Sequence, residues 1–141
     1  MRKTVIGTLL AMCALSALIF VLNEVALENY FYWKFWWYDI MMHGLVGLVL
    51  GAGAAWFLER TGYINGMSKK KIIFTSLVTV LIVGVAWEII EYTNGVFAEE
   101  ANIVRDTVAD IIMDSLGGIL GAATLARIFK KEENIITAPL I

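Results

Sequence analysis

The chain has 141 residues, of which 60% are hydrophobic and 17% are charged, and its formal net charge is −2. Soluble domains average about 45–50% apolar and about 25% charged residues, so this composition is typical of a membrane protein. The absence of a Lys/Arg excess excludes a nucleic-acid-binding module, and a single cysteine excludes a disulfide scaffold. The length suits one compact helical bundle.

Four apolar segments are long enough to cross a bilayer, which takes about 20 residues as a helix. We expect an all-α membrane protein with four transmembrane helices at about 5–24, 39–58, 72–92 and 106–128. One domain is expected over residues 1–131, followed by a loose cytoplasmic tail over 132–141. Arg2 and Lys3 precede the first segment as in a signal peptide. Its apolar run exceeds the roughly 7–15 residues of such a peptide, so we expect an uncleaved helix.

The charged residues are distributed unevenly between the two ends of these helices. With the N-terminus in the cytoplasm, nine of the eleven Lys and Arg residues lie on the cytoplasmic side, and only Lys34 and Arg105 lie outside. The positive-inside rule therefore predicts a multi-pass protein of the cytoplasmic membrane with both termini cytoplasmic. The inner side then carries +6 and the outer side −8. Because acids contribute little to topology, the outer excess indicates a site rather than an insertion signal.

Between the first two spans, residues 30–38 hold eight of the chain's seventeen aromatic side chains. Such rings favour the headgroup layer of a bilayer. We expect this aromatic segment to form an interfacial belt or a short helix on the outer leaflet. A platform that grips a lipid or sugar headgroup is the alternative.

Two spans that run from outside to inside carry polar residues or glycine at every fourth position, which places them on one helix face. They are Asp39, His43, Gly47 and Gly51 in the second span, and Asp106, Asp110, Asp114 and Gly118 in the fourth. Small residues allow close backbone approach in lipid. We therefore expect these spans to pack together at the glycines and to open a polar cavity at the acids.

The third span brings Glu88 and Glu91 to the same depth. Ionisable residues inside a membrane are costly and indicate a functional site. We take His43, Glu88 and Asp110 as candidate catalytic residues. The candidate metal ligands are Asp39, His43, Glu88, Glu91, Asp106, Asp110 and Asp114.

Structural alternatives stay open for several of these residues. Asp39 and Asp106 each precede a span and could be helix N-caps. The remaining polar groups could form a buried hydrogen-bonded network that holds the helices together. Glu99 and Glu100 are expected to be solvated loop charges.

The order and spacing of these motifs resemble VanZ-like membrane proteins and the related YjdF-like family. The resemblance covers about residues 39–121 and rests on Asp39-xxx-His43-Gly44, Trp87-Glu88-xx-Glu91 and Arg105-Asp106-xxx-Asp110-xxx-Asp114-xx-Gly117-Gly118. It implies a small helical membrane protein, and one founding member of the VanZ-like group is associated with resistance to the glycopeptide teicoplanin. VanZ-like proteins often carry Gln near the position of Glu91 and Asn near that of Asp114, so this chain is more acidic.

Three functions fit this pattern. One His among several carboxylates suits a hard or borderline divalent cation such as Mg, Mn, Ca or Zn, and predicts a metal-dependent enzyme acting on a lipid or lipid-linked envelope substrate. The second is a non-catalytic binder of an outer-leaflet ligand that uses Trp36 and Trp37 beside the acidic cavity. The third is a cation or proton transporter, for which four helices would require a homodimer. Membrane lipids are expected partners, and nucleic acids are not.

Overall fold

The computed structural model describes the backbone of residues 2–63, 67–95 and 103–136, and the side chains of residues 6–63, 67–95 and 103–129. Within these ranges the chain is all-helical, which confirms the predicted fold class. The helices are α1 (Arg2–Asn29), α2 (Phe31–Lys34), α3 (Tyr38–Arg60), α4 (Lys69–Asn94) and α5 (Ile103–Ile136). Four of them, all except α2, are long and apolar enough to cross a membrane. Glu99 and Glu100 lie outside the described residues.

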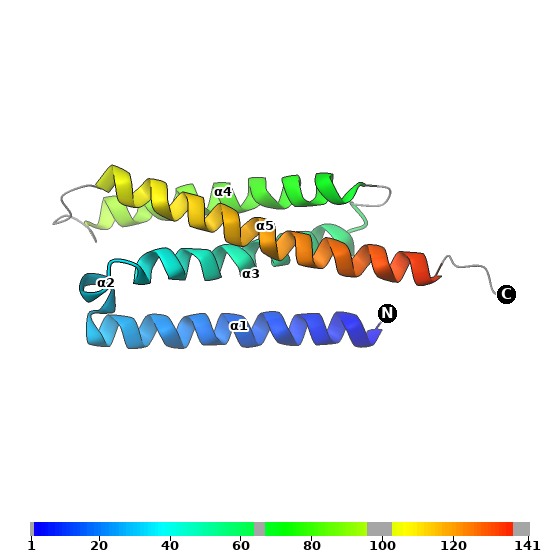
Figure 1. Cartoon of the computed structure of the whole chain (residues 1–141), viewed down its shortest axis with the longest axis horizontal. Helices are drawn as coiled ribbons and strands as arrows, with labels where there is room; N and C mark the ends of the chain where they lie inside the picture. Colours follow the sequence, from blue (N-terminus) through cyan, green and yellow to red (C-terminus); the bar gives the residue numbers. More distant parts are fainter. Residues whose placement is uncertain (1, 64–66, 96–102, 137–141) are drawn as a thin grey trace.

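The four long helices run side by side, with the start of α1 and the end of α5 at the same end of the bundle (Figure 1). The last residue of α3 and the first residues of α4 lie at this end too, so it carries the basic residues Arg60 and Lys69–Lys71. The short helix α2 lies at the opposite end. The helices extend a few residues beyond the predicted spans, and α5 continues to Ile136.

Helices α3 and α5 form the most extensive helix pair, and glycines make their close approach possible. A Cβ atom built on Gly51 would lie 2.1 Å from the carbonyl oxygen of Gly118, and one on Gly47 would lie 2.3 Å from that of Asp114. The contact is reciprocal, since a Cβ on Gly117 would meet the carbonyl of Gly44 at 2.1 Å. The two backbones touch directly, as the predicted glycine packing requires.

Below the acids, the end of the bundle that carries the basic residues is closed by a small, tightly packed core. Ala52 and Ala55 of α3 pack there with Ile72 of α4 and Leu125 of α5. Helix α4 contacts both α3 and α5. The three helices α3, α4 and α5 therefore form a compact unit.

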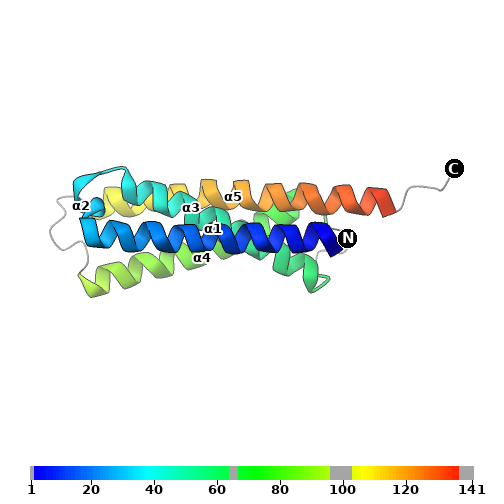
Figure 2. The same ribbon diagram turned by 90° about the horizontal axis from the view of Figure 1, so that it is seen from below.

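Helix α1 is attached to this unit more loosely. Among the described helices it contacts α2 and α3, and none of its Cα atoms comes within 8 Å of α4 or α5. Figures 1 and 2 show it running along the bundle beside α3. Two hydrogen bonds fix its end: the Tyr38 hydroxyl donates to the Leu22 carbonyl at 2.9 Å, and the Tyr32 hydroxyl donates to Asn23 Oδ1 at 2.8 Å.

The aromatic segment folds into the short helix α2 and a tight return into α3. The turn from α1 requires a left-handed backbone at Tyr30, with φ of 60°, which is uncommon for a residue with a side chain. Tyr38 is buried against Phe31 and Tyr32, with ring centroids 5.6 Å and 5.3 Å away. Trp36, by contrast, is 81% exposed. The segment thus divides into rings that pack inward and rings that face outward.

Candidate functional site

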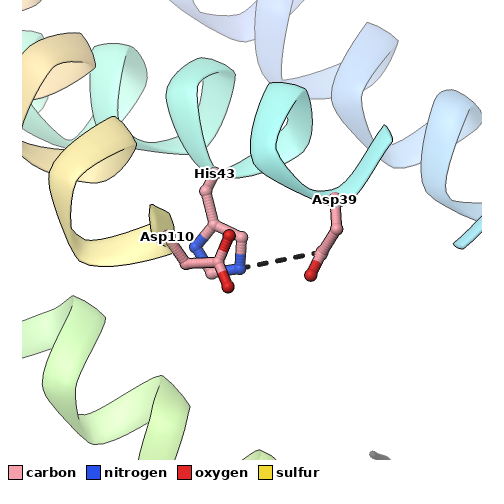
Figure 3. Close-up of side chains that lie close together, drawn as sticks. All are labelled: Asp39, His43 and Asp110. Carbon is pink, nitrogen blue, oxygen red and sulfur yellow. Dashed lines mark ion pairs between the residues drawn. The ribbon is translucent and has the colours of Figure 1, made fainter. Parts of the chain in front are cut away.

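The site is centred on His43, which is 93% buried in the half of α3 that follows α2. Its Nε2 atom lies 3.8 Å from Asp39 Oδ1, one helical turn earlier, and its Nδ1 atom lies 3.3 Å from Asp114 Oδ2 of α5. An ionised carboxylate can only accept a hydrogen bond, so this pair assigns the proton to Nδ1 when the imidazole is neutral. Nε2 is then left with a free lone pair that faces Asp39 (Figure 3).

Asp39 and Asp106 do not cap their helices. The N-cap of α3 is Trp37, and Asp39 lies in the first turn, where its carboxylate approaches the imidazole. Asp106 lies in the first turn of α5, which begins at Ile103. Negative charge in a first turn still complements the helix dipole.

Asp110 completes one group of three ligand atoms. One oxygen or nitrogen from each of Asp39, His43 and Asp110 lies within 4.8 Å of the other two. Asp110 is 1% exposed, and its Oδ1 atom has no hydrogen-bond partner. Figure 3 shows its carboxylate beside the imidazole, opposite the α3 backbone. An isolated charge in such a place is expensive unless something compensates it.

Helix α4 supplies a second group that shares the same imidazole. Glu88 and Glu91 each place one oxygen within 4.8 Å of a His43 nitrogen and of one another. The Glu88 Oε1 atom is also buried without a hydrogen-bond partner. His43 is therefore shared by two groups that together contain four carboxylates.

Asp114 lies beneath these residues, and a glycine makes room for it. It is 3% exposed, with one oxygen at His43 and the other, Oδ1, without a partner. A Cβ on Gly84 of α4 would lie 2.7 Å from Asp114 Oδ2. Gly84 is a site residue that the sequence did not single out, because a lone glycine in an apolar helix has no visible partner.

A cavity of about 590 Å³ opens beside the cluster. This is not the polar cavity that was predicted between the second and fourth spans, because its walls are different and most of its lining is apolar. It lies between α1, α3 and α4, whereas α5 contributes a single lining residue, Asp114. The reason is the glycine packing, which brings α3 and α5 too close together to leave space between them. Asp39, His43 and Glu91 line it from the other helices.

Other candidates have different positions. Asp106 is half-buried and belongs to neither ligand group nor the cavity lining. Tyr32 and Trp33 of the aromatic segment line the cavity, whereas Trp36 and Trp37 do not. The aromatic rings placed to contact a molecule in the cavity are therefore Tyr32 and Trp33 rather than the predicted pair Trp36 and Trp37.

Residues 2–131 match a family described as "Predicted membrane protein (DUF2238)", and the chain belongs to this family. No curated protein and no solved structure matches the chain. The family match supports a membrane protein, and the VanZ-like and YjdF-like resemblance stays a prediction.

Proposed function

We propose that this DUF2238 protein holds a divalent cation at His43 and its surrounding carboxylates, and uses it in metal-dependent chemistry on a lipid or lipid-linked envelope substrate. His43, Glu88 and Asp110 are the proposed catalytic residues. Asp39 and Glu91 complete the two groups of ligand atoms. The excess of basic residues at the other end of the bundle supports an outward-facing site in the cytoplasmic membrane.

One observation carries the proposal: the Asp110 carboxylate is almost fully buried, is without a hydrogen-bond partner at Oδ1, and lies within reach of His43 and Asp39. Several carboxylates around one imidazole repel each other in a medium of low dielectric constant. A divalent cation among them would turn that repulsion into attraction. The 3.8 Å gap between His43 Nε2 and Asp39 Oδ1 is too long for a hydrogen bond but is spanned by two bonds to one cation.

Asp114 has a supporting role in this arrangement. Histidines that bind metals commonly donate their other N–H to a carboxylate, which fixes the tautomer and the ring orientation. The contact of His43 Nδ1 with Asp114 Oδ2 is of this kind. Oxygen ligands with a single nitrogen favour Mg²⁺, Mn²⁺, Ca²⁺ or Zn²⁺.

A bound cation would also allow an anionic substrate to approach an otherwise acidic site, and could polarise a phosphoryl or carbonyl oxygen. A carboxylate or the imidazole that is not engaged by the cation would then serve as general base. The transporter alternative fits less well, because the fully buried ionisable side chains end at Asp114 and the bundle below is closed by backbone contacts and a small apolar core.

The test is elemental analysis of the protein purified in detergent, followed by chelation and titration with Mg²⁺, Mn²⁺, Ca²⁺ and Zn²⁺ by calorimetry. We expect one cation per chain in the wild type and loss of binding in His43→Ala. Asp106→Asn is the matched control, because it removes an acid one turn from Asp110 without touching either ligand group. Circular dichroism checks that both variants fold. Equal cation binding by His43→Ala and wild type, or none by wild type, would refute the proposal.

A further inference from the structure

The cavity beside the cluster is open along the side of the bundle. Its walls come from α1 on one side and α4 on the other, with α3 between them. The backbones of these two walls are not packed against each other, since no Cα of α1 lies within 8 Å of α4. In Figure 1, α1 is separated from α4 by α3. The cavity residues of all three helices fall within the segments long enough to cross a membrane. Of these residues, Phe20 on α1 and Val83 and Ile90 on α4 are 63%, 41% and 51% exposed, so the cavity opens toward lipid between α1 and α4.

The polarity of the walls changes along the cavity. Polar side chains line the end near α2, where Asp39, His43 and Glu91 lie. Towards the membrane middle the lining becomes mostly apolar, with Val46 and Leu50 on α3, Val83 on α4 and Phe20 on α1, and Ser16 of α1 contributes a single hydroxyl there. The lining of α3 runs from Asp39 to Leu50, which corresponds to about 16 Å of helix, and the stretch beyond His43 to about 10 Å. The cavity is thus an apolar groove with ionisable residues at the end near α2.

Water would be a poor occupant of the deeper part, because it would find few hydrogen-bond partners there. A hydrocarbon chain would lose nothing by entering, since the bilayer and the groove walls are similarly apolar. The groove therefore contributes little affinity of its own. The groove instead positions the bound molecule, because a hydrocarbon chain lying in it places the attached headgroup beside His43. Correct placement of the reacting groups is a large part of catalysis.

We infer that the cleft between α1 and α4 is the binding site for one hydrocarbon chain of a membrane amphiphile, which enters sideways from the bilayer. This inference rests on the proposed function for the role of the headgroup end, where the cation would bind the polar part of the same molecule. Its substrate class is accordingly an amphiphile rather than a water-soluble metabolite. Tyr32 and Trp33 line the same cavity at the level where aromatic rings contact headgroups.

The test blocks the groove with a large side chain and measures whether a photoreactive acyl chain still labels it. Val83→Trp fills the groove from α4, and Val85→Trp is its matched control. The two valines are similarly exposed, at 41% and 45%, but only Val83 lines the cavity. Each protein is reconstituted in phosphatidylcholine vesicles containing phosphatidic acid with a diazirine in one acyl chain. After irradiation, labelled peptides are identified by mass spectrometry.

We expect labelling of Val46 and Leu50 in the wild type and in Val85→Trp, and at least a fivefold loss in Val83→Trp. Val46→Trp, which fills the groove from α3, keeps the test valid if Val83→Trp fails to fold; labelling of Leu50 and Val83 is then followed. Equal labelling of groove residues in the blocked and control variants would overturn the inference, as would labelling confined to the outer faces of the helices.

Cation content is measured on the same preparations, so that failure of the metal-dependent function can be distinguished from failure of the hydrocarbon-chain site. Suppose that the wild type binds no cation but that acyl-chain labelling is still lost in Val83→Trp. The inference about the groove would then hold, and the proposed metal-dependent function would be refuted. If the wild type binds a cation but is labelled only on the outer faces of its helices, the proposed metal site would hold and the inference about the groove would be refuted.

Discussion

Replacing Gly51 by alanine tests whether direct backbone contact between α3 and α5 holds the site together. The new Cβ would lie 2.1 Å from the Gly118 carbonyl oxygen, 2.6 Å from its Cα and 2.7 Å from its carbonyl carbon. Ordinary contacts between such atoms begin near about 3.4 Å, so the helices must separate locally by roughly 1 Å. These neighbours are backbone atoms in the middle of a helix and cannot rotate away.

Overpacking of this kind costs about 1–3 kcal/mol. The better helix propensity of alanine returns up to about 1 kcal/mol of that. Gly53→Ala is the matched control two residues along α3, because its Cβ would meet only the Met12 side chain, at an ordinary 3.6 Å. Both variants gain the same helix propensity, so the difference between them is the overpacking cost alone. We expect Gly51→Ala to be less stable than Gly53→Ala by about 1–3 kcal/mol.

The measurement is equilibrium unfolding in mixed micelles, with SDS fraction as the denaturant and helicity as the signal. Cation binding provides a second readout, since separating α3 from α5 also separates His43 from Asp114. Equal stability of the two alanine variants would show that the glycine contacts do not hold the helices as described, and would refute the reasoning.

Three further predictions concern single groups. Asp114→Asn keeps the shape but not the charge of the second carboxylate at the imidazole, so cation affinity measured by calorimetry should fall about 10–100-fold with little change in helicity. Tyr38→Phe removes the buried hydroxyl that holds α1 and should cost about 1 kcal/mol in SDS unfolding, whereas Tyr63→Phe, an exposed control, should cost nothing measurable. Burial and, secondarily, the charge of Asp39 raise the pKa of Tyr32 from 10.0 to about 12. Stability should therefore fall as pH rises from about 10 to about 12, where the unfolded chain has lost a proton that the native state retains, and Tyr32→Phe should fall less steeply in the same titration.

Much of this architecture is predictable because membrane helices leave strong periodic signals. Apolar length locates the four spans, and four-residue spacing places His43, Asp110 and Asp114 on the facing sides of α3 and α5. The same spacing predicts that the glycines meet, which the contact of Gly51 with Gly118 confirms.

The sequence pattern does not determine which helices form the walls of the cavity. Periodicity gives the face of each helix but not which helices surround a space. The position of α1 depends on specific contacts such as the Tyr38 hydroxyl at Leu22 and on the left-handed turn at Tyr30. For this reason the sequence pattern predicts a cavity between α3 and α5, whereas the cavity lies between α1, α3 and α4. Gly84 was missed for the same cause, since its role depends on the Asp114 side chain arriving from a different helix.

The pairing of α3 with α5 has a consequence for biosynthesis. Helices enter the membrane in chain order, and α3 precedes α5 by one complete span. Until α5 arrives, the glycine face of α3 has no partner, and His43 stands in the bilayer without Asp110 or Asp114. A truncated chain that ends after α4 would keep Asp39, His43, Glu88 and Glu91, but it would lack Asp110, Asp114 and all the contacts between α3 and α5. The site is therefore completed only when α5 is inserted, so its assembly reports that this helix has entered the membrane.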